Sequence, residues 1–154
     1  MTTLRDAIRQ GKPFDSLEQE AHLALLRTAA EVDHAVAEAL KPYDITPTQY
    51  NVLRILRGAG GEGLCRNEVR ERMIARVPDA TRLLDRMESA GLIQRERNSD
   101  DRRFVTTRIS EAGTSLLAEL ETPIAELHRR HLGHLAPDEL RALLRLLERV
   151  RAAL

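Results

Sequence analysis

Apolar residues recur at helical spacing through most of the chain. Between Phe14 and Leu40 they return every three or four positions, a spacing that predicts one long amphipathic helix. The members of this stripe are Leu17, Ala21, Leu25, Ala29, Val32, Val36 and Leu40. Lys41-Pro42 ends the predicted helix, because the residue before a proline is pushed out of the helical region.

Two more Leu-rich helices are predicted in the C-terminal part of the chain. The first begins at Ser110, and Pro123 inside it predicts a kink or a break. The second begins near Pro137 and continues to Leu154. Together with the 14–40 helix, these segments have more apolar surface than the central residues can cover. Pairing with the same helices of a second copy is the economical way to bury it.

Shorter helices are predicted between these flanking segments. Thr46-Pro47-Thr48-Gln49 combines a capping residue, a proline at the first helical position and the glutamine of a capping box, so we expect a helix to begin there. Two short helices follow, one at about 66–74 and one from Val77-Pro78 to Ala90. Gly91 stands where a left-handed C-cap suits the end of the second.

A β-hairpin completes the central part. Segments 92–97 and 103–109 lie on either side of the turn-forming Asn98-Ser99-Asp100-Asp101. The order of elements predicts a mainly α protein with a small β-hairpin wing, in which the N- and C-terminal helices form a dimerisation region. We expect one domain over 1–154. Within it, a winged helix-turn-helix occupies about 46–109, and the dimerisation helices occupy about 14–40 and 110–154.

Composition limits the class of protein. Of the 154 residues, 42% are hydrophobic and 31% are charged, which is typical of a globular chain. The net charge is zero, yet segment 66–108 has eleven Arg against eight acidic residues, a modest local excess that suits a nucleic-acid contact surface. The one cysteine excludes an intrachain disulfide, and no segment has the length and apolarity of a signal peptide or a bilayer span. We therefore expect a cytoplasmic protein with no membrane partner.

The second short helix and the hairpin contain the candidate functional residues. In a helix-turn-helix, the second helix lies in the DNA major groove and its exposed side chains reach base edges. Arg82 and Arg86 are four residues apart and share one side of this helix, where arginine binds guanine or phosphate. An arginine at a hairpin tip suits the narrow minor groove. The candidate DNA-binding residues, all between Leu64 and Ile109, are Asp79, Thr81, Arg82, Arg86, Arg102 and Arg103.

The run from Val77 to Gly113 strongly resembles the MarR family of bacterial regulators. The matching features are Thr81-Arg82-Leu83-Leu84-Asp85-Arg86-Met87-Glu88, Gly91-Leu92-Ile93, Asp101-Arg102-Arg103 and Ser110-Glu111-Ala112-Gly113. The resemblance implies a homodimeric, sequence-specific repressor that binds a pseudo-palindromic operator in double-stranded DNA and is released by a small ligand, a phenolic for example. It also implies DNA contacts by Arg82 and Arg86 in the major groove and by Arg103 in the minor groove. No cofactor is implied.

Three positions depart from the family pattern. Val77-Pro78 replaces the serine usual before the recognition helix and lacks a capping oxygen. Cys65 stands where threonine or serine commonly caps the preceding helix, and Asn98 replaces an aspartate at the start of the wing. These departures do not change the predicted fold, but the resemblance no longer specifies which bases the protein contacts.

Cys65 and three histidines spaced three residues apart each have a functional and a structural interpretation. A thiol at a helix N-terminus beside Arg66 is a candidate redox sensor, and the alternative is a small, partly buried apolar filler. His128, His131 and His134 would need further ligands from elsewhere to bind a metal, and the alternative is that they are exposed or interfacial. We predict no metal site.

Two other classes of function are the alternatives to a regulator. An enzyme is disfavoured, because the chain has no Gly-rich phosphate loop, no nucleophile elbow and no H-E-x-x-H motif. A protein-binding adaptor would use the winged helix without DNA. It would show no salt-dependent binding of duplex DNA, whereas neutralisation of phosphates gives a steep dependence on salt.

Overall fold

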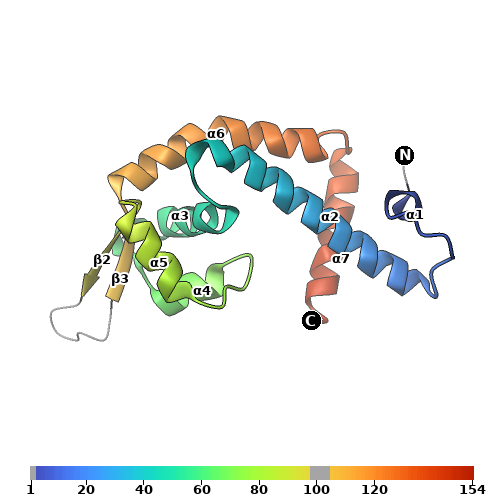
Figure 1. Ribbon diagram of the computed structural model, residues 1–154, viewed down its shortest axis with the longest axis horizontal. Helices are drawn as coiled ribbons and strands as arrows, with labels where there is room; N and C mark the ends of the chain where they lie inside the picture. Colours follow the sequence, from blue (N-terminus) through green and yellow to red (C-terminus); the bar gives the residue numbers. More distant parts are fainter. Residues whose placement is uncertain (1–2, 98–104) are drawn as a thin grey trace.

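A small sheet lies at one end of a mainly helical molecule in this computed structural model, which describes residues 3–97 and 105–154 (Figure 1). The elements, in chain order, are α1 (Leu4–Ala7), α2 (Leu17–Leu40), η1 (Lys41–Tyr43), α3 (Pro47–Ala59), η2 (Gly60–Glu62), β1 (Leu64–Cys65), α4 (Arg66–Arg72), α5 (Ala80–Ser89), β2 (Ile93–Arg97), β3 (Val105–Ile109), α6 (Glu111–Leu132) and α7 (Pro137–Arg151). The predicted class, mainly α with a small hairpin wing, is confirmed.

Local capping signals fix the helix ends around the centre of the chain. Thr46 Oγ1 accepts a hydrogen bond from the Gln49 N–H at 3.2 Å, and Gln49 Oε1 accepts one from the Thr46 N–H at 2.8 Å, so the predicted capping box is present. After α5, Gly91 has a φ of 72°. The Leu92 N–H then reaches the Met87 carbonyl at 3.0 Å, which is the Schellman ending that the glycine predicts.

The three strands form one antiparallel sheet in the order β1-β3-β2. The β2–β3 hairpin is as predicted, with Ile93 opposite Ile109 and Arg97 opposite Val105. Strand β1, which follows Gly63, was not predicted, because two residues are too few to show an alternating pattern. A Cβ on Gly63 would lie 2.7 Å from atoms of β3, and its φ is 73°, so this close approach of β1 to β3 requires glycine.

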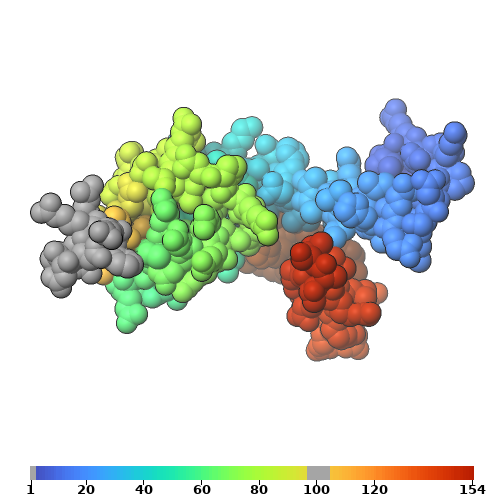
Figure 2. Space-filling view, turned by 90° about the horizontal axis from the view of Figure 1, so that it is seen from below, coloured from blue at the N-terminus to red at the C-terminus, as the bar shows by residue number. Residues whose placement is uncertain are grey.

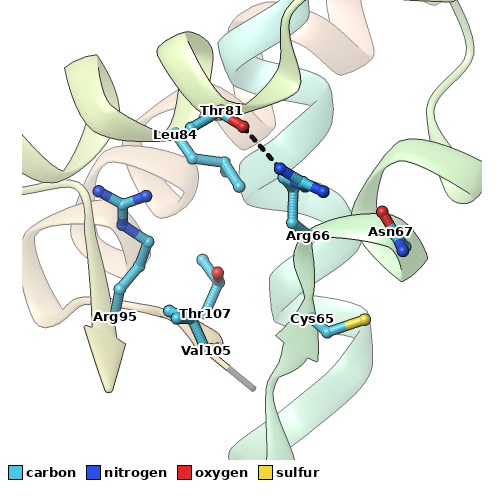
Figure 3. Close-up of a pocket in the computed structure, with 8 residues that line it drawn as sticks. All are labelled: Cys65, Arg66, Asn67, Thr81, Leu84, Arg95, Val105 and Thr107. Atoms are coloured by element: carbon cyan, nitrogen blue, oxygen red, sulfur yellow. Dashed lines mark hydrogen bonds between the residues drawn. The ribbon is translucent and has the colours of Figure 1, made fainter. Parts of the chain in front are cut away.

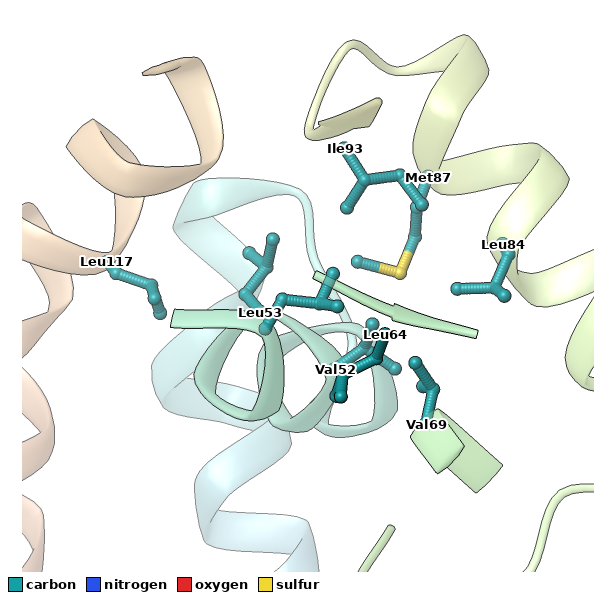
Figure 4. Packing of buried hydrophobic residues seen from close by; sticks show 9 residues of the cluster. Val52, Leu53, Leu64, Val69, Leu84, Met87, Ile93 and Leu117 are labelled. Atoms are coloured by element: carbon teal, nitrogen blue, oxygen red, sulfur yellow. The ribbon is translucent and has the colours of Figure 1, made fainter. Parts of the chain in front are cut away.

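Two hydrophobic clusters make up the core. The first joins α3, β1, α4, α5, β2 and α6 (Figure 4), and its buried members are Val52, Leu53, Leu56, Leu64, Val69, Leu84, Met87, Ile93 and Leu117. The second joins α2 to α6 through Leu40, Ile45, Leu120, Ile124 and Leu127. Since α6 contributes to both clusters, it attaches the long N-terminal helix to the winged helix-turn-helix.

Two predicted helix ends are wrong, and one of the two alternatives at Pro123 is excluded. Helix α6 continues from Glu111 to Leu132 with Pro123 inside it, so Pro123 does not break the helix. The missing N–H of Pro123 is tolerated because Leu120 and Ile124, on either side of it, are anchored in the second cluster. Helix α5 begins at Ala80 instead of Val77-Pro78, because Asp79 supplies a capping carboxylate. The last helix ends at Arg151, before Leu154.

The outer helices leave much of their apolar surface uncovered. Helix α7 has no buried residue, and Leu40 is the one residue of α2 that is fully buried. Figures 1 and 2 show α7 extending from the end of α6, clear of the winged helix-turn-helix. The exposed large apolar residues of these two helices are Leu17, Leu25, Leu26, Val32, Leu143, Leu144, Leu146 and Val150.

Replacement of Gly113 by alanine should destabilise the fold. Gly113 is buried in the first turn of α6, and a Cβ there would collide with the Leu92 carbonyl oxygen and approach Ile109 Cγ1 to 2.9 Å. The Leu92 oxygen cannot move freely, because it accepts the Ser110 N–H at 3.1 Å. We expect Gly113→Ala to lower the free energy of unfolding by about 2 kcal/mol in chemical denaturation.

Gly58→Ala is the matched control for this prediction. Gly58 lies in α3, and apart from its chain neighbours and the backbone of its own helix, no atom of the described residues is within 4 Å of a Cβ added at this position. Alanine there should leave stability unchanged or raise it by up to about 1 kcal/mol, because it restricts the unfolded chain. Equal effects of the two substitutions would contradict the packing of α6 described above.

Candidate nucleic-acid interface

Helix α5 presents a polar face away from the core. Thr81, Arg82, Asp85 and Arg86 are exposed, whereas Leu84 and Met87 are buried in the first hydrophobic cluster. The predicted placement of Thr81, Arg82 and Arg86 on one exposed surface therefore agrees with the structure. Among the described residues, neither arginine forms an ion pair. Their guanidinium groups are available to an external anion.

Asp79 has a structural role that the sequence did not predict. Its Oδ1 accepts the Arg82 N–H at 2.9 Å, which makes it the N-cap of α5. A capping carboxylate satisfies a backbone donor that has no partner inside the helix. The geometry gives its carboxylate the role of holding the first turn of α5, and the DNA contact that the sequence predicts for Asp79 stays a prediction.

Arg66 approaches α5 from the preceding helix. It is the first residue of α4, and its Nη1 donates a hydrogen bond to Thr81 Oγ1 at 3.0 Å (Figure 3). Arg66 and Thr81 are both exposed. The sequence did not predict this contact, because Thr81 lies fifteen positions away from Arg66 and no local pattern indicates it.

Arg95 joins the wing to the recognition helix. From β2, its Nε donates to Glu88 Oε2 at 2.8 Å and its Nη2 to Asp85 Oδ1 at 2.6 Å. Its side chain is 22% exposed, less than either carboxylate partner. The hydrogen bonds to Glu88, and secondly to Asp85, raise the pKa of Arg95 above its ordinary value despite its partial burial. The guanidinium group is therefore charged at neutral pH, and its hydrogen bonds to Glu88 and Asp85 hold β2 against α5.

Arg108 ties the wing to the loop before β1. Its Nε donates to the Gly61 carbonyl at 2.7 Å, and its Nη1 pairs with Glu96 of β2. Like Arg95, it is committed to partners within the protein. The arginine excess of segment 66–108 therefore includes structural arginines, such as Arg95 and Arg108, as well as exposed ones without an ion pair among the described residues, such as Arg82 and Arg86.

The predicted wing-tip contacts fall outside the described residues. Arg102 and Arg103 belong to segment 98–104, so their role in the minor groove stays a prediction. The strands that lead to this segment are described up to the pair formed by Arg97 and Val105.

Cys65 borders a cavity next to the recognition helix. The cavity, of about 300 Å³, is lined by Cys65, Arg66, Asn67, Thr81, Leu84, Arg95, Val105 and Thr107 (Figure 3). Cys65 is partly buried and free, and its N–H donates to Glu68 Oε2 at 2.7 Å, a bond that lowers the pKa of Glu68. The structure thus places Cys65 at the start of α4, and redox sensing there stays a prediction.

The histidine string lies at the end of α6 and the turn that follows it. His128 and His131 are in the helix, and His134 comes after it. Over residues 3–97 and 105–154 there is no group of three or more His, Cys, Asp or Glu placed to hold a metal ion. In the same ranges, every helix is too short or too polar to cross a membrane.

These features define a winged helix protein with an arginine-bearing recognition helix. A family model described as MarR family matches residues 45–105. The multiple antibiotic resistance protein MarR of Salmonella typhimurium is 31% identical over 121 residues, which cover 77% of this chain and 81% of that protein. The chain belongs to the MarR family.

Solved structures agree with this assignment. A MarR transcription factor from Planctomyces limnophilus shares 42% identity, with a TM-score of 0.69, over 88% of this chain and 98% of that one. A mutant of MarR from E. coli, complexed with operator DNA, shares 27% identity, with a TM-score of 0.74, over 82% of this chain and 90% of that one. The predicted family and the winged helix fold are both confirmed.

Removal of the Arg95 clamp should weaken the winged helix unit. Arg95→Met leaves the carboxylates of Asp85 and Glu88 close together without their shared cation. Since both carboxylates are partly hydrated, we expect a loss of about 1–2 kcal/mol in the free energy of unfolding. Arg57→Ala is the control, because the Arg57–Glu121 pair also joins two elements but is more exposed, and it should cost less than about 0.5 kcal/mol. Equal losses would show that Arg95 is an ordinary surface residue.

Proposed function

We propose that this protein is a homodimeric, sequence-specific transcriptional regulator that binds double-stranded DNA through α5 and the wing. The observation that carries the proposal is the exposed pair Arg82 and Arg86 on a helix whose other side is anchored in the core. A rigid helix with free guanidinium groups suits the major groove, where arginine binds guanine O6 and N7 or a phosphate. The operator complex of the E. coli relative supports the same use of the fold.

The homodimer is proposed from the uncovered helices. Leu144 and Leu146 of α7 are 59% and 56% exposed, and Leu26 of α2 is 55% exposed. A 15-residue amphipathic helix without a buried residue gains little from folding against its own chain. A second copy would cover α7 and α2 and hold two α5 helices about one DNA turn apart.

Repression and its release are further parts of the proposal. A dimer of this shape would bind a pseudo-palindromic operator and block transcription while bound. A small ligand, with phenolics as the first class to test, would release it by binding more tightly to a dimer whose recognition helices are wrongly spaced, because a ligand shifts an equilibrium only through such a difference in affinity. A cytoplasmic location, and regulation in place of catalysis, belong to the same proposal.

The test of function is binding to duplex DNA as a function of salt. We expect affinity for a selected operator to fall steeply with salt, since each neutralised phosphate releases counterions. Arg82→Ala should weaken operator binding by about 1–3 kcal/mol and relax the base preference. Arg103→Ala should weaken all sequences more evenly. Lys41→Ala is the control, because Lys41 is an exposed cation of η1 outside the proposed interface.

Two results would contradict this proposal. A protein-binding adaptor would show no salt-dependent binding of any duplex, in fluorescence anisotropy or gel shift. Binding at the wild-type level by both Arg82→Ala and Arg103→Ala would leave DNA binding in place but refute the residues assigned to it.

The dimer is tested by a charge on the exposed face of α7. Leu144→Asp removes no buried packing from the single chain but places a carboxylate where the partner is expected. We expect it to sediment as a monomer and to lose about 100-fold or more in operator affinity, because one recognition unit then binds without the second. Ile74→Asp, at a residue 90% exposed beside α4, should sediment like the wild type. A dimeric Leu144→Asp protein would contradict the assigned interface.

A further inference from the structure

We infer that Arg66 is a positioning residue that makes Thr81 a hydrogen-bond donor to an acceptor atom on a base edge, and so sets the preference at one position of each operator half-site. This inference rests on the proposed DNA-binding function. It concerns a residue outside the recognition helix, and it specifies which kind of base atom Thr81 recognises.

The donor chemistry of Arg66 fixes the role of the Thr81 hydroxyl. A guanidinium group has hydrogen-bond donors and no acceptor. In the contact between Arg66 Nη1 and Thr81 Oγ1, at 3.0 Å, the hydroxyl oxygen must therefore accept. The hydroxyl hydrogen is directed elsewhere, and it has no acceptor among the residues that the structure describes. It is available to donate to DNA.

The charge of Arg66 strengthens this preference. A cation that donates to a hydroxyl polarises its O–H bond, which makes the hydrogen a better donor and the oxygen a poorer acceptor. A base that offers a donor, such as the amino group of cytosine or adenine, would also meet the positive charge behind Thr81. In the major groove the acceptors are O6 and N7 of guanine, N7 of adenine and O4 of thymine. Thr81 should therefore favour guanine or thymine edges.

The position of Thr81 favours a base edge over a phosphate. Thr81 is the second residue of α5, and residues near the N-terminus of a recognition helix contact bases. It shares one side of the helix with Asp85, which is held by Arg95, while Arg82 and Arg86 lie on the adjacent row. Two arginines from outside α5 thus bond to this row: Arg95 pairs with the Asp85 carboxylate, and Arg66 donates to Thr81, whose hydroxyl keeps a hydrogen to donate to a base.

The experiment is a double-mutant cycle on base discrimination. The wild-type protein first selects its operator from a pool of randomised duplexes, and each base pair of one half-site is then replaced in turn. Affinities are measured for the wild type, Arg66→Ala, Thr81→Val and the double variant. Asn67→Ala is the control, because Asn67 follows Arg66 on α4 and lines the same cavity without bonding to Thr81.

We expect discrimination at one position to fall by roughly 3- to 10-fold in Thr81→Val, the range of one net hydrogen bond. Arg66→Ala should reduce discrimination at that same position, and the double variant should lose no more of it than Thr81→Val. Asn67→Ala should keep it. If guanine is the preferred base and its N7 is the acceptor, 7-deazaguanine at that position would remove the wild-type preference. If Arg66→Ala folds poorly, Arg66→Met, which keeps a long side chain but has no hydrogen-bond donor, takes its place in the cycle.

Other outcomes would overturn the inference. If Arg66→Ala weakens all sequences equally, with and without Thr81, then Arg66 is a phosphate contact and does not act through the hydroxyl. If Thr81→Val changes no base preference, then Thr81 does not contact a base. A pool that yields no enriched duplex would remove the proposed function as well, whereas an enriched operator with either of the first two results removes this inference alone.

Discussion

The burial of α6 in two hydrophobic clusters is the constraint on which the rest of the structure depends. Leu117 packs in the cluster of the winged helix unit, and Leu120, almost one turn further, packs in the cluster that holds α2. Because one helix belongs to both clusters, the recognition helix is held in a fixed relation to α2. Gly113 lets α6 begin in contact with the Leu92 carbonyl, and without that approach the two clusters would not share a helix.

Polar contacts within the protein determine which arginines of segment 66–108 remain available to bind DNA. Arg95 and Arg108 bind carboxylates and a carbonyl within the protein and fix the wing against α5 and the loop before β1. A count of charges along the sequence cannot separate these from the arginines that face outward. Arg82 and Arg86 are exposed, form no ion pair among the described residues and lie four positions apart on α5, and it is this arrangement more than the local excess of charge that suits DNA.

Local signals made much of the fold predictable. The capping box at Thr46, the C-cap at Gly91 and the apolar stripes depend on residues within one or two turns, so the sequence shows them directly. The missed features depend on contacts far along the chain. Strand β1 exists because Leu64 pairs with Thr107, Pro123 is tolerated because of packing on α2, and Arg66 acquires its role from Thr81. The exposure of Thr81, Arg82 and Arg86 on the outer side of α5 was predictable because it follows from helical spacing alone.

The same rigidity limits how the proposed switch can work. Within one protomer, α5 is joined to the wing by Arg95 and to α4 by Arg66, and the shared packing of α6 holds this unit to α2. A ligand that moved α5 by itself would have to break these contacts and disturb the first cluster. A change in the angle between two protomers, across the exposed faces of α2 and α7, disturbs none of them. In the proposed dimer, control of operator binding therefore belongs to the spacing of the two units, while the preference for bases is set inside each one.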